Sequence, residues 1–83
     1  MYILTISFIE NEITHYVVGP KLDRLLTGLG DLQNAIRDYN GDIGVKIEKE
    51  IGPNNLLVLD GFICSNYSFE TIKDSLLDLF LNE

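Results

Sequence analysis

The 83-residue sequence contains a single cysteine, Cys64, and a single histidine, His15. A lone cysteine has no partner for an internal disulfide, and no CxxC or Cys/His spacing typical of a structural zinc site surrounds it. No third group is placed to orient a Cys–His pair for catalysis, so we interpret Cys64 as a small core residue and His15 as a surface strand residue. We expect a protein of the reducing cytoplasm that holds no metal and no other cofactor.

Basic residues are also few, with six Lys and Arg against 13 Asp and Glu, a net charge of −7 and a sequence pI of about 4.4. The six are dispersed, and no basic patch alternates with aromatic residues as it does in proteins that bind single strands. Direct binding to nucleic acid is therefore disfavoured, and an anionic membrane surface would repel the chain. This charge balance favours a basic protein as the partner.

Long apolar runs are absent as well. The opening segment MYILTISFIENE carries no basic residue before its apolar residues, and Thr5 and Ser7 interrupt them. We expect neither a signal peptide nor a membrane span here, but a strand. Apolar residues nevertheless make up 46% of the chain, including four Phe and four Tyr. Residues 1–83 are thus predicted to fold as one small acidic domain.

The first half of the chain predicts a hairpin. Residues 2–9 alternate in the manner of a half-buried strand, and a second β-rich run at 13–19 follows the polar break at 10–12. If those three polar residues form the loop, Ile6 faces Tyr16 on the core side of the sheet. A two-residue loop would reverse the faces of the second strand.

Helical spacing of apolar residues continues from Pro20 to the Asn40-Gly41 stop signal. The stretch TGLGDLQ within it contains a GxG spacing, but a dinucleotide loop needs a preceding strand and a third glycine, and Asp31 would repel a phosphate. We therefore interpret Gly28 and Gly30 as shaping the helix. A break is expected near Gly30, with Asp31 as the new cap.

The second half predicts two more strands and a helix. Residues 42–51 alternate between apolar and charged side chains, and 55–65 are apolar on both faces after a GPNN turn. The Asp60-Gly61 pair either bulges one strand, which we favour, or forms a hairpin turn that divides it. The last helix begins at Ser68 as N-cap, with Tyr67 and Ile72 as a hydrophobic staple.

The predicted order is therefore strand, strand, helix, strand, strand, helix. This order favours an α+β fold, a four-stranded and largely antiparallel sheet with both helices on one face. No repeat or low-complexity segment interrupts it.

Paired carboxylates are the remaining catalytic candidates, at Glu10 with Glu12 and at Glu48 with Glu50. Acid–base catalysis would need one acid of a pair to be buried with a raised pKa, and all four lie among lysines and turn residues that look solvated. We expect no catalytic residue and no enzymatic activity.

Two surfaces remain as candidate binding sites. Glu70, Asp74 and Asp78 recur every four residues, which places three carboxylates on one helix face about 6 Å apart, a spacing that resembles the phosphates of a nucleic acid. The alternative interpretation is a solvated helix face. The second surface is apolar and lies on the open side of the sheet, where a homodimer interface is predicted from five residues: Ile9, Ile13, Val17, Leu56 and Val58.

The function predicted from these features is a non-enzymatic interaction module. In this hypothesis the chain is an inhibitor, an immunity-type protein or a phage-encoded modulator that docks on a larger basic protein, such as one that binds nucleic acid. The alternative is a structural or regulatory homodimer through the open sheet face, without mimicry of DNA.

Overall fold

The computed structural model describes residues 1–65 and 68–82. Strands and helices follow one another in the predicted order, with the first helical segment divided in two. Their bounds are β1 (Tyr2–Phe8), a short 3-10 turn (Ile9–Asn11), β2 (Ile13–Gly19), α1 (Leu22–Asp31), α2 (Gln33–Asp38), β3 (Ile43–Gly52), β4 (Asn55–Cys64) and α3 (Ser68–Asn82).

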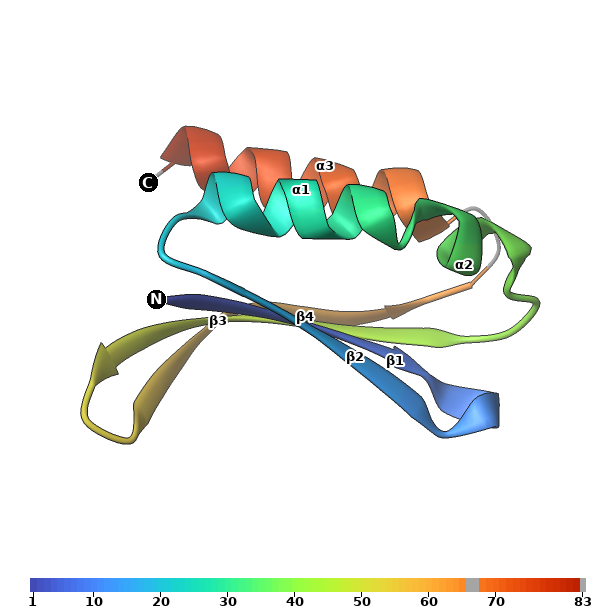
Figure 1. Ribbon diagram of the computed structural model, residues 1–83, viewed down its shortest axis with the longest axis horizontal. Coiled ribbons are helices and arrows are strands. Elements are labelled where there is room, and N and C mark those ends of the chain that lie inside the picture. Colours follow the sequence, from blue (N-terminus) through green and yellow to red (C-terminus); the bar gives the residue numbers. More distant parts are fainter. Residues whose placement is uncertain (66–67, 83) are drawn as a thin grey trace.

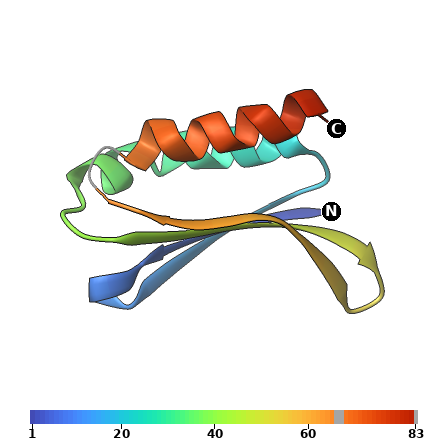
Figure 2. The ribbon, with the colours of Figure 1, turned by 180° about the vertical axis from the view of Figure 1, so that it is seen from behind.

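The four strands form one antiparallel sheet in the order β2-β1-β3-β4, and the helices lie side by side over one of its faces (Figure 1). The predicted α+β fold is confirmed. β1 and β3 occupy the centre of the sheet, where alternate residues of each are buried, and β2 and β4 form the edges. The view from behind shows that the face opposite the helices is covered by no other element of the described chain (Figure 2).

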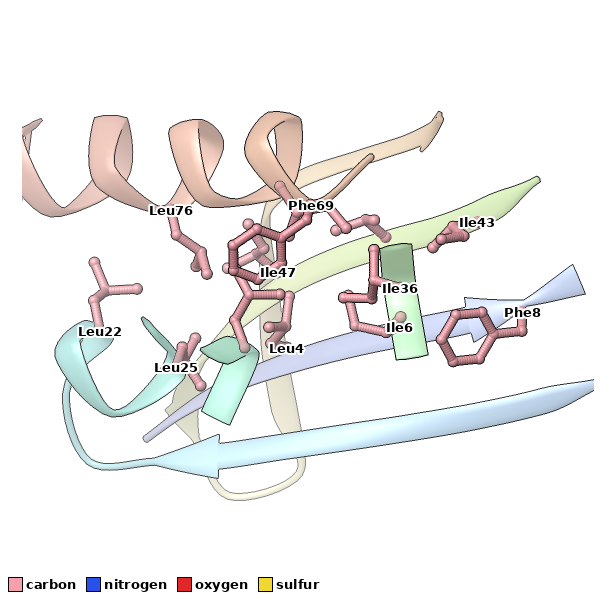
Figure 3. Packing of buried hydrophobic residues seen from close by; sticks show 13 residues of the cluster. Leu4, Ile6, Phe8, Leu22, Leu25, Ile36, Ile43, Ile47, Phe69 and Leu76 are labelled. Carbon is pink, nitrogen blue, oxygen red and sulfur yellow. The ribbon is translucent and has the colours of Figure 1, made fainter. Parts of the chain in front are cut away.

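The core lies between the sheet and the helices (Figure 3). Leu4 and Ile6 of β1 and Ile47 of β3 are fully buried there, against Leu25 of α1 and Leu76 of α3. Burying a side chain of this size stabilises the fold by about 1.5–3 kcal/mol relative to leaving it in water. Helical spacing of three and four residues on α1 and α3, and spacing of two on the strands, places these residues on one side of each element.

The three-residue loop predicted for the first hairpin is wrong, and β2 has the reversed faces that the alternative, even-numbered loop predicts. The loop has four residues rather than three, because Ile9 leaves the strand to begin the 3-10 turn and Glu12 takes a left-handed conformation with φ of 56°. Ile6 therefore pairs with His15, and Tyr16 points to the face opposite the core. One extra residue in the loop exchanges the two faces of the whole of β2.

The helix break is confirmed, but at a different residue. Leu32, with φ of −96° and ψ of 2°, is the C-cap of α1 and the N-cap of α2, and no side-chain hydrogen bond caps the start of α2. Gly28 lies where α1 approaches β2 most closely. A Cβ atom built on Gly28 would stand 2.2 Å from Cγ1 of Val17, while one on Gly30 would meet nothing within 4 Å. No glycine has a positive φ, so Gly28 serves this close approach.

β4 is one strand with a bulge, as favoured from the sequence. The pairing passes from Ile47 with Asp60 to Glu48 with Val58, which leaves Leu59 as the extra residue. The preceding turn places Asn54 at φ of 62° after Pro53, the arrangement typical of a type II turn. The predicted staple includes Tyr67, which lies outside the described residues.

Candidate interaction surfaces

The sheet face opposite the helices, called the open face below, follows from the alternation of side chains along each strand. Because Leu4, Ile6 and Val45 enter the core, their strand neighbours point the other way. The open face consists of Ile3, Thr5 and Ser7 of β1, Thr14, Tyr16 and Val18 of β2, Gly44, Lys46, Glu48 and Glu50 of β3, and Leu56, Val58, Gly61 and Ile63 of β4.

Large apolar side chains on the open face are unusually exposed. Five of them expose between 47% and 69% of their area, namely Tyr16, Val18, Leu56, Val58 and Ile63. They lie on the two edge strands, on both sides of the central strands. Thr5, Lys46 and Glu48 of the central strands lie between them, so the open face presents two exposed apolar strips, one along each edge strand.

A shallow hollow of about 500 Å³ lies on the β3–β4 side of the open face. Gly44 and Gly61 form part of its lining because they have no side chain to fill it, and Ser7, Val58 and Ile63 stand around it. A Cβ atom on either glycine would make only ordinary contacts, the nearest at 3.7 Å. The fold therefore has room for larger residues at both positions.

Glu48 is the one carboxylate on the open face that is nearly buried, with 11% of its side chain exposed. Its direct cross-strand neighbours are Ile3 and Val58, and Lys46 lies two residues away with its ammonium 3.6 Å from the carboxylate. The expectation that Glu48 is solvated is thus wrong, because two apolar neighbours cover it. The ion pair with Lys46 offsets the cost of removing this charge from water.

The three acids predicted as a docking stripe are all exposed on α3, but their surroundings differ. Glu70 accepts a hydrogen bond of 3.0 Å from the guanidinium of Arg37, which also lies 5.2 Å from the ring centre of Phe69. Asp74 and Asp78 form no ion pair within the described chain. The stripe therefore has one member tied to α2 and two that face solvent.

The five residues predicted as a dimer interface do not all reach the open face. Leu56 and Val58 lie on it, and Ile9 reaches its margin, since its Cδ1 atom stands 3.8 Å from the position of a Cβ on Gly44. Val17 instead packs under α1, and Ile13 pairs with Phe8 on the helix side of the sheet.

Sequence reasoning missed Tyr16, Val18 and Ile63 as open-face residues. A three-residue loop places Tyr16 on the core side, and Val18, two residues further along β2, shares the face of Tyr16. A four-residue loop, with Ile9 counted in the turn, would have placed both on the open face. The pairing of Ile63 with Gly44 places Ile63 on the open face. The sequence holds no signal for this placement, because the strand is apolar on both faces.

The candidate catalytic residues are not brought together. His15 lies on β2 with its ring edge against Phe8, and the thiol of Cys64 on β4 donates to the carbonyl of Ile43, so the two central strands separate them. Across residues 1–65 and 68–82, no group of three or more potential ligands is placed to hold a metal ion.

The carboxyl of Glu10 has a pKa lowered by hydrogen bonds. It accepts hydrogen bonds from the hydroxyl of Tyr39 and from the amide of Asp42, and these lower the pKa of its carboxyl, the Tyr39 hydroxyl contributing most. The pKa of Tyr39 is raised, through desolvation first and then through the same hydrogen bond. A general acid at neutral pH needs a raised pKa, which is the opposite of the shift at Glu10. The hydrogen bonds of Glu10 instead connect the first hairpin to the segment between α2 and β3.

No family model, no curated protein and no solved structure matches the chain. Within the part of the chain that the structure describes, no helix is both long and apolar enough to cross a membrane.

Proposed function

We propose that this protein is a non-enzymatic interaction module that associates with a second copy of itself through the open face. The observation that carries this proposal is the exposure of five large apolar side chains on the face that no helix covers: Tyr16, Val18, Leu56, Val58 and Ile63. Removing such side chains from water favours association by roughly 25 cal/mol per Å² before the costs of association are subtracted.

The size of the open face suits this partner. The sheet extends along the longest and shortest dimensions of the Cα trace, 36 and 19 Å, which bound an area of roughly 700 Å² (Figure 1). A standard protein interface buries about 800 Å² on each partner.

The open face carries little of the charge that opposes a second copy. Lys46, Glu48 and Glu50 are the charged residues of the open face, and Lys46 and Glu48 already form an ion pair. Most of the charge that would oppose self-association therefore lies elsewhere, on the helices and at the hairpin ends.

The test compares two lysine substitutions on neighbouring residues of β4. Val58→Lys places a charge on the open face, whereas Leu57→Lys, at a site of similar exposure, places it on the other side of the sheet. Sedimentation equilibrium should show a dimer for the wild type and for Leu57→Lys, and a folded monomer for Val58→Lys. A wild type that stays monomeric at every concentration, or equal effects of the two variants, would contradict the proposal.

A second candidate function is docking on a larger basic protein through the helix layer. The observation that favours it is the charge of the helices, which carry six exposed acids and three exposed bases. A homodimer through the open face would leave both helix layers outward and available for such a partner.

Replacing Glu70, Asp74 and Asp78 together with Gln or Asn tests this second function. The triple variant should associate more slowly with a basic protein recovered from the native source, and this association should lose part of its salt dependence. Unchanged association rate and salt dependence would mean that these residues form only a solvated helix face.

A further inference from the structure

The open face carries a protruding aromatic ring and a hollow in the same row of the sheet. Tyr16 of β2 pairs with Thr5 of β1, Thr5 pairs with Lys46 of β3, and Lys46 pairs with Gly61 of β4. Tyr16 exposes 68% of its area at one end of this row, and the glycine hollow lies at the other end. The ring and the hollow are thus related across the midline between β1 and β3.

From this arrangement we infer that the dimer forms face to face about a two-fold axis parallel to the strands, and that Tyr16 of each copy enters the hollow of the other. This inference rests on the proposed self-association and specifies its geometry. Such an axis along the sheet midline exchanges the positions of β2 and β4, so it places Tyr16 of one copy over Gly61 of the second copy.

The twist of the sheet supports the same axis. The tips of the β1–β2 and β3–β4 hairpins, at opposite corners, bend away from the helices, so the open face is saddle-shaped (Figures 1 and 2). A two-fold axis parallel to the strands places the protruding corners of each saddle opposite the receding corners of the other. Two copies therefore have complementary shapes in this orientation, which is the aligned packing common in β-sandwiches.

The neighbouring rows also match under this axis. Val18, Ile3, Glu48 and Val58 form the next row, so Val18 of one copy lies over Val58 of the second copy. Lys46 of one copy lies over Thr5 of the second copy. The Thr5 hydroxyl can accept a hydrogen bond from the Lys46 ammonium, which already pairs with Glu48 of its own chain. The apolar contacts thus fall near the edges of the interface, and the two Lys46–Glu48 pairs, one from each copy, lie near its centre, an arrangement opposite to the usual apolar centre and polar rim.

The test combines loss of the ring with filling of the hollow. Tyr16→Ala should weaken dimerisation roughly 30-fold, as removal of an aromatic residue from a partner's pocket usually does. Gly61→Val should weaken it by at least about 10-fold while the monomer stays folded, because a Cβ at Gly61 would make only an ordinary contact of 3.7 Å with the carbonyl oxygen of Val45. Leu81→Ala, which truncates an 80% exposed residue on α3, is the matched control and should leave the dimer unchanged.

The double variant provides the decisive measurement. With the ring removed, the valine at position 61 no longer collides with it, so Tyr16→Ala combined with Gly61→Val should dimerise no more weakly than Gly61→Val alone. If the double variant dimerises more weakly than Gly61→Val by the full factor seen for Tyr16→Ala alone, or if neither single variant weakens the dimer, the inferred geometry is overturned. Dissociation by Val58→Lys would in that case still support self-association through the open face. If Gly61→Val fails to fold, Gly44→Val fills the same hollow and is measured in its place.

Discussion

Replacing Gly28 with alanine tests how closely α1 approaches the sheet. The new Cβ atom would lie 2.2 Å from Cγ1 and 3.0 Å from Cγ2 of Val17, far inside van der Waals contact. Alanine stabilises a helix by about 1 kcal/mol relative to glycine, while forcing an extra methyl into a packed site costs about 1–3 kcal/mol. Because α1 must lift away from β2, we expect the steric cost to exceed the helical gain, with a net loss of up to about 2 kcal/mol.

Gly30 is the matched control, since it lies two residues away in the same helix with nothing within 4 Å of its Cβ position. Gly30→Ala should stabilise the fold by up to about 1 kcal/mol. In thermal unfolding, each kcal/mol corresponds to a shift of about 4–8 °C for a domain of this size. The two alanine variants should therefore melt on opposite sides of the wild type.

A double variant shows whether Val17 causes the difference. In a Val17→Ala background the colliding methyl groups are gone, so Gly28→Ala should no longer destabilise and should approach the gain seen at Gly30. Should Gly28→Ala raise the melting temperature as much as Gly30→Ala does in the wild-type background, the close approach of α1 to β2 would be refuted.

Two further predictions concern the loops. Hydrogen bonds lower the pKa of Glu10 in the folded state, so its contribution to stability is present above the ordinary carboxyl pKa of 4.5 and is lost as the pH falls through the folded value. Glu10→Gln should therefore be less stable than the wild type near pH 7, with the difference shrinking below about pH 4.5 in urea titrations. A difference that stays constant with pH would mean that the hydrogen bonds of the Glu10 carboxylate do not stabilise the fold. Asn54 has φ of 62°, so Asn54→Ala should lose about 1 kcal/mol in the same assay while Asn54→Gly stays near the wild type, and equal effects would exclude backbone strain as the cause.

Local patterns were sufficient to predict the fold class. In α1, β3 and α3 the apolar residues recur with the period of the helix or strand, so each element has one apolar side, and that side is buried. Few arrangements of helices and strands bury the apolar side of every element at once. The bulge in β4 was also predictable, because a glycine after Asp60 interrupts an otherwise continuous apolar strand.

The candidate surfaces were harder to predict because they depend on register. Whether Tyr16 is a core residue or an exposed ring is decided by one residue in the loop at 9–12, and Ile9 fits a strand as well as a turn. Likewise, Glu48 alternates with apolar residues like any solvated strand residue. Its burial depends on Ile3 and Val58, which come from distant parts of the sequence.

The distribution of charge gives the two proposed interactions opposite responses to salt. Each chain carries a net charge of −7, and the helices hold much of the acidic excess while the open face holds little. Two copies therefore repel at long range and attract through apolar contact, so salt, which shortens the Debye length from about 10 Å at 0.1 M to about 3 Å at 1 M, should leave self-association unchanged or strengthen it. Docking of the helix layer on a basic partner should weaken over the same range, because there the long-range force is attractive. One salt titration of both interactions thus separates them, and self-association that weakened as salt rose would mean that charges, rather than the apolar residues of the open face, hold the two copies together.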